Sequence, residues 1–468
     1  MTHEYMSISP STTSALGSPF STPSTRELKS DERGIYLIQL LLRCAEQVSA
    51  NSFDQTNQCL EHISMLASPT GDTVQRIASC FTHALALRVL SSWRGFYIVL
   101  NPPPPTPAES LAARRHFFDL CPFLRLSYMI SNQAIMETME GEKMIHIIDL
   151  SFSDPAQWVP LLHLLRDRKE GPPHLRITGI NEHKQLLDHT AVLLSEEAER
   201  LDIPFQFNQV VSRLDNLDPN LVRIKTGEAL AISSVLQLHC LLASDDDAAA
   251  ARKGTPFLTS RNSCSIAQFH RIVQMSQGTL GELLEKDILL NGYSMSPDSA
   301  SSSPFGLPPA PKMERFLSWL CGLSPKVMVV TEQESNHNGF SMNERFMESL
   351  NYYAALFDCL ESTMARPSAE RMKVEKLVWG EEIRNIVACE GVERRERHEK
   401  LEKWVHRMEM AGFGSVPLGY YTLLQARRLL QGFGCEGYKI REENGFLHLC
   451  WQDRSLFSVS AWRRRRFD

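Results

Sequence analysis

The stretch from Lys143 to Trp158, KMIHIIDLSFSDPAQW, decides the fold of this chain. Its first half, MIHIIDL, has the apolar run and terminal acid of the opening strand in a nucleotide-binding α/β domain. A glycine-rich turn comes next in such domains, because backbone amides must come close to the cofactor. Here no glycine occurs between Gly141 and Gly171, so the strand and its acid are present without the binding loop.

Short apolar runs alternate with helical patterns from this stretch onward. This alternation predicts an open, mostly parallel sheet with helices on both faces. The expected strands are Met144–Leu150, Leu175–Ile180, Phe205–Val211, Ala229–Val235 and Val327–Thr331. The expected helices between them are Trp158–Arg168, Gln185–Leu201 and Cys264–Met275.

The C-terminal part predicts further helices and then an antiparallel ending to the sheet. Ser341 and Glu344 form a capping-box pattern that opens a helix, and a charged helix is expected from Arg394 to Met410. Asn444-Gly445 is a tight-turn signal between alternating segments. Five parallel strands closed by an antiparallel hairpin are the methyltransferase type of doubly wound α/β sheet. The expected closing strands are Tyr438–Glu443, Phe446–Trp451 and Leu456–Trp462.

The segment ahead of the sheet is predicted to be mainly helical. Residues 1–30 are rich in Ser, Thr and Pro and are expected to be disordered. Residues 31–140 would form a helical cap, and residues 141–468 the α/β core, with loop insertions near 243–252 and 295–311. Asp72 with Gln75 is a further helix-start pattern within the cap.

An apolar stripe near the N-terminus has two interpretations. Its residues recur at i, i+4, i+7 and i+11, which places them on one helix face. The stripe either packs inside a closed cap or is left open for a second chain, with partner binding as its function. Its members are Leu37, Leu41, Cys44 and Val48.

Composition narrows the class of protein. Of 468 residues, 43% are hydrophobic and 22% charged, which is ordinary for a soluble globular protein. We expect no transmembrane helix, because no apolar run reaches about 18 residues, and no secretion signal, because the N-terminus lacks the required basic and apolar regions. The 11 cysteines include no C-x-x-C pair, which predicts buried, reduced thiols. A net charge of −6 and a pI near 6.2 argue against a globally basic nucleic-acid binder.

Motifs in a fixed order along the chain resemble those of the plant GRAS family. IHIID at residues 145–149 resembles the VHIID motif, and LRITGI follows at residues 175–180. RFMESLNYYAALFDCLEST from Arg345 stands in the place of the PFYRE motif, EGVERRERHEKLEKW begins at Glu390, and SAW lies at residues 460–462. The motif residues that we interpret as structural are Ile145, His146, Ile147, Ile148, Asp149, Gln157, Trp158, Ser460, Ala461 and Trp462.

The resemblance implies a fold, a location and partners. It implies a methyltransferase-like sheet with a helical cap, in a nuclear transcriptional co-regulator of gibberellin signalling and root development. Its partners would be other GRAS proteins, including DELLA-type repressors, in homodimers or heterodimers, and zinc-finger transcription factors of the indeterminate-domain type. DNA would be reached only through such a partner, and no membrane contact is implied.

The sequence predicts no catalytic, cofactor-binding or metal-binding residue. The bulky turn after Asp149 favours a structural acid over a ligand-binding one, and His146 is interpreted as a satisfied core histidine. Glu332, Glu334 and His337 follow a strand end and would line a pocket, but no nucleophile or metal spacing accompanies them. The alternative from another class is a small-molecule-binding or S-adenosylmethionine-dependent enzyme, which only the fold suggests.

Overall fold

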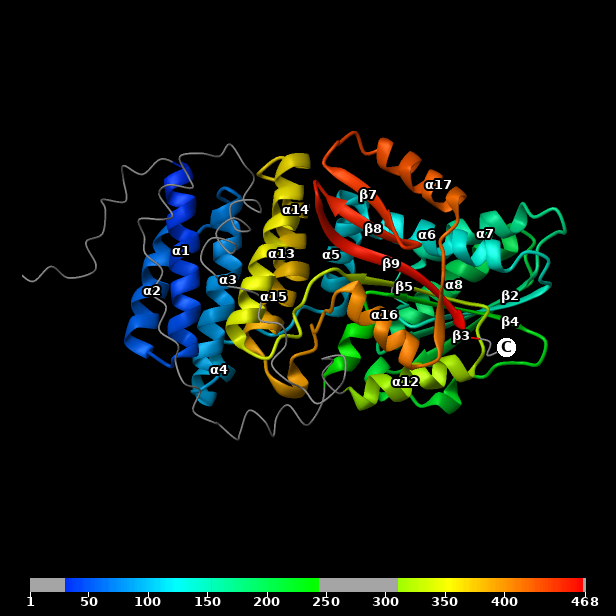
Figure 1. Ribbon diagram of the computed structural model, residues 1–468, viewed down its shortest axis with the longest axis horizontal. Coiled ribbons are helices and arrows are strands. Elements are labelled where there is room, and N and C mark those ends of the chain that lie inside the picture. Colours follow the sequence, from blue (N-terminus) through cyan, green and yellow to red (C-terminus); the bar gives the residue numbers. More distant parts are fainter. Residues whose placement is uncertain (1–29, 153, 244–309, 466–468) are drawn as a thin grey trace, which may run out of the picture.

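A sheet with the strand order β3-β2-β1-β4-β5-β9-β8-β7 forms the centre of the computed structural model, which describes residues 30–152, 154–243 and 310–465 (Figure 1). Strands β1 to β5 run parallel, and β9, β8 and β7 continue the sheet antiparallel to one another, with β6 paired to β9. The strands are β1 (Met144–Asp149), β2 (His174–Asn181), β3 (Phe205–Val211), β4 (Ala229–Val235), β5 (Val327–Gln333), β6 (Phe413–Val416), β7 (Tyr438–Glu443), β8 (Phe446–Trp451) and β9 (Arg454–Arg464).

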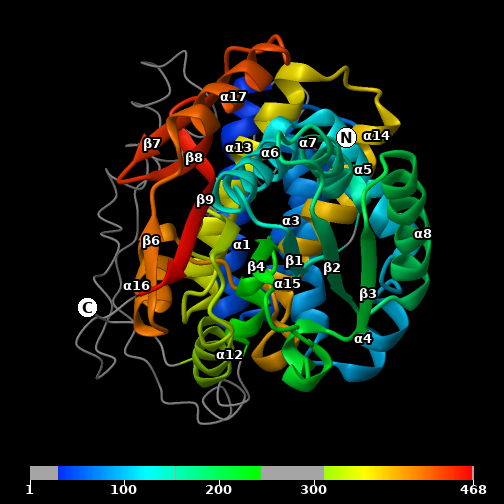
Figure 2. The same cartoon turned by 90° about the vertical axis from the view of Figure 1, so that its right-hand side faces the viewer.

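Helices cover both faces of this sheet (Figure 2), because its strands carry apolar side chains on both sides. Ile145 and Ile147 of β1 belong to one apolar cluster with α6, α7 and α8. Ile148 points the other way, into a second cluster with α12 and α16. The helices are α6 (Pro122–Thr138), α7 (Trp158–Arg166), α8 (Lys184–Arg200), α12 (Pro311–Gly322) and α16 (Leu401–Met410), and α17 (Tyr420–Gln431) packs on α6.

The helical cap is built from two distant parts of the chain. Helix α3 packs against α1, α2, α13 and α15, and these helices stand together at the left of Figure 1. Helix α5 contacts α14, whereas α6 contacts β5 and β9 of the sheet. The N-terminal helical segment therefore supplies part of the cap and part of the core. The remaining bounds are α1 (Ser30–Ser49), α2 (Phe53–Leu66), α3 (Thr73–Leu90), α4 (Arg94–Leu100), α5 (Pro107–Leu120), α13 (Met342–Thr363), α14 (Ala369–Val374) and α15 (Gly380–Ala388).

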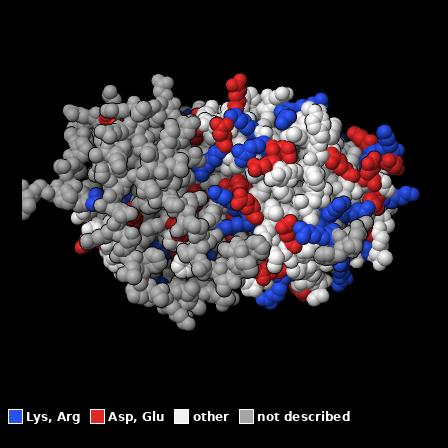
Figure 3. Space-filling model, viewed as in Figure 1, with Lys and Arg blue, Asp and Glu red and all other residues white. Residues whose placement is uncertain are grey.

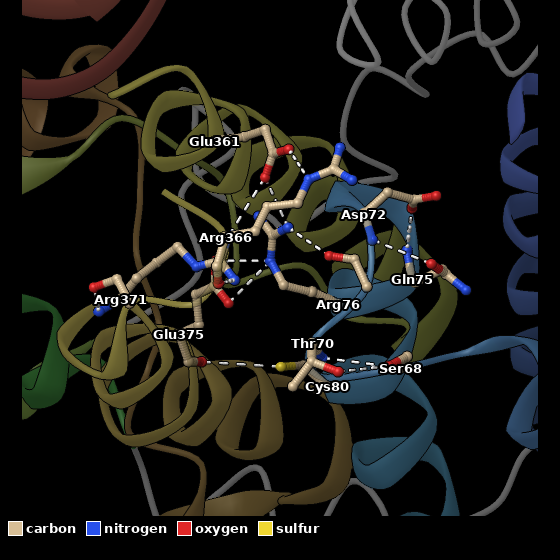
Figure 4. Close-up of polar contacts among 12 residues, drawn as sticks. Ser68, Thr70, Asp72, Gln75, Arg76, Cys80, Glu361, Arg366, Arg371 and Glu375 are labelled. Carbon is tan, nitrogen blue, oxygen red and sulfur yellow. Dashed lines mark hydrogen bonds and ion pairs between the residues drawn. The ribbon is translucent and has the colours of Figure 1, made fainter. Parts of the chain in front are cut away.

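Arg76 on α3 joins the two parts of the cap (Figure 4). Its buried guanidinium donates from Nε to both carboxylate oxygens of Glu375, at 3.0 and 3.1 Å, and from Nη1 to Glu361 at 2.8 Å. Glu375 begins a π-helical turn, η5 (Glu375–Trp379), which lies between α14 and α15. The ion pairs therefore link α3 to helices that lie far away in the sequence.

The structure confirms the doubly wound sheet, and the predicted strands match the observed ones to within two residues at each end. Asn444 and Gly445 make the tight turn between β7 and β8 with φ values of 53° and 83°. Both capping boxes form: Asp72 with Gln75 at α3, and Ser341 with Glu344 at α13.

The predicted helix from Arg394 to Met410 is wrong in its first part, because α16 begins only at Leu401 and residues 394–400 have no regular secondary structure. Arg394, Arg397 and Glu399 of this segment are buried with partners rather than solvated. Arg397 donates to Gly391 O at 2.9 Å, and Glu399 pairs with Arg407 at 2.7 Å. These tertiary contacts outweigh the helical preference of the charge pattern.

Some predictions fall outside the described residues. These are the N-terminal tail up to residue 29, the helix expected over 264–275 and nearly all of the two predicted loop insertions. Within the described parts of the chain, no helix has the length and apolar character needed to cross a membrane.

Candidate functional site

The carboxylate of Asp149 is engaged by the turn that follows β1. Its Oδ1 accepts hydrogen bonds from Ser151 N at 2.9 Å and Ser151 Oγ at 3.2 Å, and its Oδ2 accepts one from Trp158 Nε1 at 2.9 Å. Burial raises the pKa of Asp149 to about 6, although these donors act against the rise. Asp149 therefore holds the turn and the start of α7 against the end of β1.

Phe152 fills the place where a glycine turn would admit a cofactor. Its ring is fully buried and lies 4.9 Å from the ring of Phe207. A Cβ atom on Gly179 of β2 would come within 2.7 Å of Phe152 Cγ and 2.8 Å of Phe207 Cζ, so side chains already occupy this space. Asn181 closes the turn further by donating from Nδ2 to Phe152 O at 2.6 Å.

His146 is a hydrogen-bonded core histidine. Its Nδ1 lies 3.0 Å from Arg176 Nη2, and its Nε2 lies 2.8 Å from Thr178 Oγ1. Because arginine only donates, Nδ1 accepts and the ring proton is on Nε2. Burial, followed by the charge of Arg176, lowers the pKa of His146 to about 4. The ring is therefore neutral at physiological pH, and Arg176 takes its counter-charge from Glu228.

The other motif residues also lie in the interior, where they join elements. Gln157 donates to Ser233 Oγ of β4 at 3.0 Å, and its carbonyl accepts from Asn132 of α6 at 2.6 Å. Trp462 Nε1 donates to Ser460 Oγ at 2.8 Å where β9 pairs with β5. The residues buried with these are Ile145, Ile147, Ile148, Trp158 and Ala461.

A cavity of about 430 Å³ opens beyond the carboxyl ends of the parallel strands. Open α/β sheets bind their ligands at this edge. Polar groups from distant segments line the cavity: Arg114 of α5, Gln333 at the end of β5 and Glu382 of α15. His239 and Glu396 lie at its wall.

These two residues belong to a set of side chains that extends from the wall into the interior, here called the His–Glu cluster. Its members are His239, Glu332, His337, Glu396 and His398. His239 bridges two acids, with Nδ1 2.7 Å from Glu332 Oε2 and Nε2 3.0 Å from Glu396 Oε2. Nδ1 of His337 lies 2.9 Å from Nδ1 of His398. Glu332 also accepts from the amides of residues 237 and 238 at 3.1 and 2.7 Å, which fixes η4 (Leu238–Leu242) beside β5.

The protonation states in the cluster are unequal. Burial acts to lower the pKa of His239, but Cys240 and the two acids outweigh it and raise the pKa well above its usual value. Both ring nitrogens of His239 face a carboxylate, which favours its charged form. Burial, followed by the charge of His239, lowers the pKa of His337 to about 3, and the same two causes lower that of His398. Burial and then Glu396 raise the pKa of Glu382 to about 7.

The structure separates the three predicted pocket residues. Glu332 and His337 enter the His–Glu cluster, whereas Glu334 accepts from Leu401 N at 3.1 Å, at the start of α16. Sequence reasoning missed the rest of the cluster, whose members lie in η4 and in the irregular segment ahead of α16. The cluster residues that the sequence did not predict are His239, Glu396 and His398.

The apolar stripe on α1 lies inside the cap. Leu37, Leu41 and Cys44 are fully buried and Val48 is 8% exposed, in the cluster that also contains Ile77, Phe81 and Phe346. In the folded chain the stripe has a packing role. Partner binding by these four residues remains a prediction.

Apolar side chains are exposed instead on and around α4, in a surface here called the α4 patch. Val99 is 80% and Ile98 66% exposed, and none of the residues of α4 is buried. Phe53 of α2 lies beside it, with its ring 5.3 Å from that of Trp93. The members of the patch are Phe53, Trp93, Phe96, Ile98, Val99 and Leu100.

Comparison with known proteins places these features in a family, since residues 37–463 match the GRAS domain family. The chain belongs to the GRAS domain family. This GRAS chain is 56% identical over 465 residues to Scarecrow-like protein 3 of Arabidopsis thaliana, covering 98% of this chain and 95% of that protein. It is 32% identical to DELLA protein RGL1 of the same plant, covering 96% and 74% of the two chains.

A solved GRAS structure has the same architecture. The crystal structure of SCL7 from Oryza sativa matches with a TM-score of 0.68 and 26% identity, covering 91% of this chain and 99% of that one. The sheet with its helical cap is therefore the fold of this GRAS chain and of a relative.

Proposed function

We propose that this GRAS protein is a nuclear transcriptional co-regulator that acts through protein–protein contacts. Its partners are other GRAS proteins, including DELLA-type repressors, and zinc-finger transcription factors of the indeterminate-domain type, in gibberellin signalling and root development. The observation that carries the proposal is the 56% identity to Scarecrow-like protein 3 over nearly the full length of both chains.

The α4 patch supports binding of a protein partner. Contiguous exposed apolar side chains are uncommon on monomeric proteins and typically mark interaction surfaces. We infer that a second GRAS chain covers the patch, helix against helix, because Phe96, Ile98 and Val99 are exposed together on one short helix. Their buried counterparts on α1 pack within the cap, and partner binding by those residues is a separate prediction.

Affinity purification from plant nuclei followed by mass spectrometry tests this function. We expect the wild-type chain to retain GRAS and indeterminate-domain proteins, and Val99→Glu to lose the GRAS partner. Leu221→Glu is the matched control, because Leu221 is also exposed, at 53%, but lies on η3 (Pro219–Leu221) beside the sheet. Equal recovery of GRAS partners by all three proteins contradicts the patch, and absence of both partner classes contradicts the function.

DNA contact through a partner is favoured by the charge distribution. The net charge is −6, and on the face shown in Figure 3 basic and acidic side chains are interspersed rather than gathered by sign. The described residues on that face therefore form no extended basic footprint for phosphates. In gel-shift experiments we expect sequence-selective binding only when a zinc-finger partner is added, and selective shifts by the GRAS protein alone would contradict this.

The cavity at the strand ends favours one alternative, a small-molecule-binding or S-adenosylmethionine-dependent enzyme. Two features argue against binding of S-adenosylmethionine. Phe152 fills the turn that would have to be open, and both carboxylate oxygens of Asp149 already accept hydrogen bonds, so the acid is not free for a cofactor. Isothermal titration separates the two functions. A dissociation constant for S-adenosylmethionine at or below about 1 μM, near −8 kcal/mol, would favour the enzyme.

A further inference from the structure

Three donor atoms of the His–Glu cluster are close enough to share one metal ion. One ring nitrogen of His239, a carboxylate oxygen of Glu396 and one ring nitrogen of His398 lie within 4.8 Å of one another. Oε2 of Glu396 is 3.0 Å from His239 Nε2 and 3.3 Å from His398 Nε2. Ligands about 2.0–2.2 Å from one ion lie roughly 3.0–3.5 Å apart in tetrahedral or octahedral geometry. The two spacings to Glu396 Oε2 fall in this range and fit a single ion.

Each of the two histidines is also held from behind. His239 Nδ1 lies 2.7 Å from Glu332 Oε2, and His398 Nδ1 lies 2.9 Å from His337 Nδ1, whose ring in turn contacts Ser335 Oγ at 2.9 Å. Metal-ligating histidines nearly always have such a partner on their other ring nitrogen, which orients the ring. Both rings are thereby fixed with Nε2 toward Glu396.

His398 Nε2 is the observation that points to a ligand. The ring is fully buried, and among the described residues this nitrogen has no hydrogen-bond partner. It lies 3.3 Å from Glu396 Oε2 without making a hydrogen bond to it. A buried polar atom without a partner costs free energy. A cation between the nitrogen and the carboxylate oxygen satisfies both.

We propose that His239, Glu396 and His398 bind one divalent first-row transition-metal ion, with zinc as the best match to two imidazoles and a carboxylate. Three protein ligands leave a coordination position for water or a small ligand. Because His239 and Glu396 line the cavity at the strand ends, that position faces the cavity. The site does not depend on the proposed function, because it joins η4 to the segment ahead of α16 whichever partner the chain binds.

Metal and protons compete for the ligand atoms of this site, because histidine binds a metal ion through a ring nitrogen that carries no proton. The Nε2 lone pair of His239 would bind the metal, and Nδ1 would keep its contact with Glu332. We therefore expect metal affinity to weaken as the pH is lowered.

Isothermal titration of the full-length, chelator-treated protein with zinc chloride tests the site. We expect one Zn²⁺ per chain with a dissociation constant of about 1 μM or lower. His398→Gln should abolish this binding, and Glu332→Gln, which keeps an oxygen for the amides of η4, should weaken it about 10–100-fold. His163→Gln is the matched control, since His163 is exposed and pairs with Glu197 outside the cluster.

The visible spectrum of the wild-type protein with Co²⁺ provides a readout that needs no variant. Cobalt held by nitrogen and oxygen shows weak ligand-field bands, whereas cobalt on cysteine adds strong sulfur-to-metal charge transfer. Ligand-field bands without that transition support the site. Sulfur charge transfer, absence of zinc binding, or unchanged binding by His398→Gln would each overturn it.

Discussion

Phe152 and Gly179 lie in contact across the edge of the sheet where related folds place a cofactor. Gly179→Ala would put a methyl group within 2.8 Å of the rings of Phe152 and Phe207, and we expect this overpacking to cost about 1–3 kcal/mol. Phe152→Ala should cost about 3–5 kcal/mol through the cavity that it leaves. In the double variant the methyl group occupies the space that Phe152 has left. Its loss of stability should therefore be smaller than the sum of the losses in the two single variants.

Urea denaturation of the two single variants and the double variant measures this coupling. Gly322→Ala is the control, because a Cβ atom at Gly322 meets nothing within 4 Å and should leave the stability nearly unchanged. Additive costs in the double variant would show that Phe152 does not fill the space beside Gly179.

Asp149 makes stability depend on pH in a defined direction. Burial raises the pKa of its carboxyl in the folded chain to about 6 from 3.8, so the folded state holds the proton over this interval while the unfolded state has lost it. Its contribution to stability is therefore present at low pH and is lost as the pH rises through 6. The stability of the wild type relative to Asp149→Asn should be about 1 kcal/mol greater at pH 5 than at pH 7. Denaturant titrations at both pH values check this, and a difference of the opposite sign contradicts it.

Single residues also show how far the sequence predicts the site. The neighbours of Asp149 and His146 predict their roles. A bulky turn follows Asp149, and the apolar residues of a strand flank His146. His239, Glu396 and His398 have no such local pattern. They meet only because η4 follows β4, the strand beside β5, and because the segment ahead of α16 is not helical. A spacing rule along the chain cannot find donors that only the tertiary fold brings together.

At the scale of elements, α1 and α4 place apolar side chains in opposite environments. Leu41 is fully buried, so Leu41→Glu places an unpaired charge in the cap and should cost more than about 3 kcal/mol. Melting temperature, soluble yield and partner capture should fall together. Val99→Glu, at a position that is 80% exposed, should keep the wild-type melting temperature and circular dichroism spectrum. A Leu41→Glu variant that stays folded but loses its GRAS partner would show instead that α1 takes part in partner binding.

Elements with a local signal are those that the sequence predicts well. The ends of the strands are predictable because their apolar runs stop at polar or turn residues. The starts of α3 and α13 are predictable because each begins with a capping box. Residues 394–400 have the opposite character. Their charge pattern is typical of a solvated helix, but Arg397 and Glu399 find buried partners that exist only in the folded chain. Local propensity is a weak prior where tertiary ion pairs compete with it.

At the scale of the whole molecule, the cap and the sheet share one interior. A single apolar cluster includes Leu41 of α1, Phe81 of α3, Phe346 of α13 and Ile147 of β1. Helices from both ends of the chain therefore complete one core, and neither a cap nor a sheet domain is marked off by a short linker. We expect the chain to unfold in one cooperative transition.

Arg76 tests this cooperativity, because it joins α3 to Glu361 of α13 and, across 299 residues of sequence, to Glu375 of η5. Arg76→Met leaves Glu375 buried without its main partner and should cost about 3–5 kcal/mol. Arg76→Met combined with Glu375→Leu should recover most of that loss, since Glu361 keeps Arg366 at 2.7 Å. Arg366→Met is the control, because Arg366 is exposed and a surface pair contributes no more than about 1 kcal/mol.

Guanidinium denaturation, followed by circular dichroism for the helices and by tryptophan fluorescence for the core, measures both the loss of stability and the number of unfolding transitions. We expect the circular dichroism and fluorescence transitions to shift together in Arg76→Met. An early helical transition with unchanged fluorescence would show instead that the cap unfolds separately from the sheet.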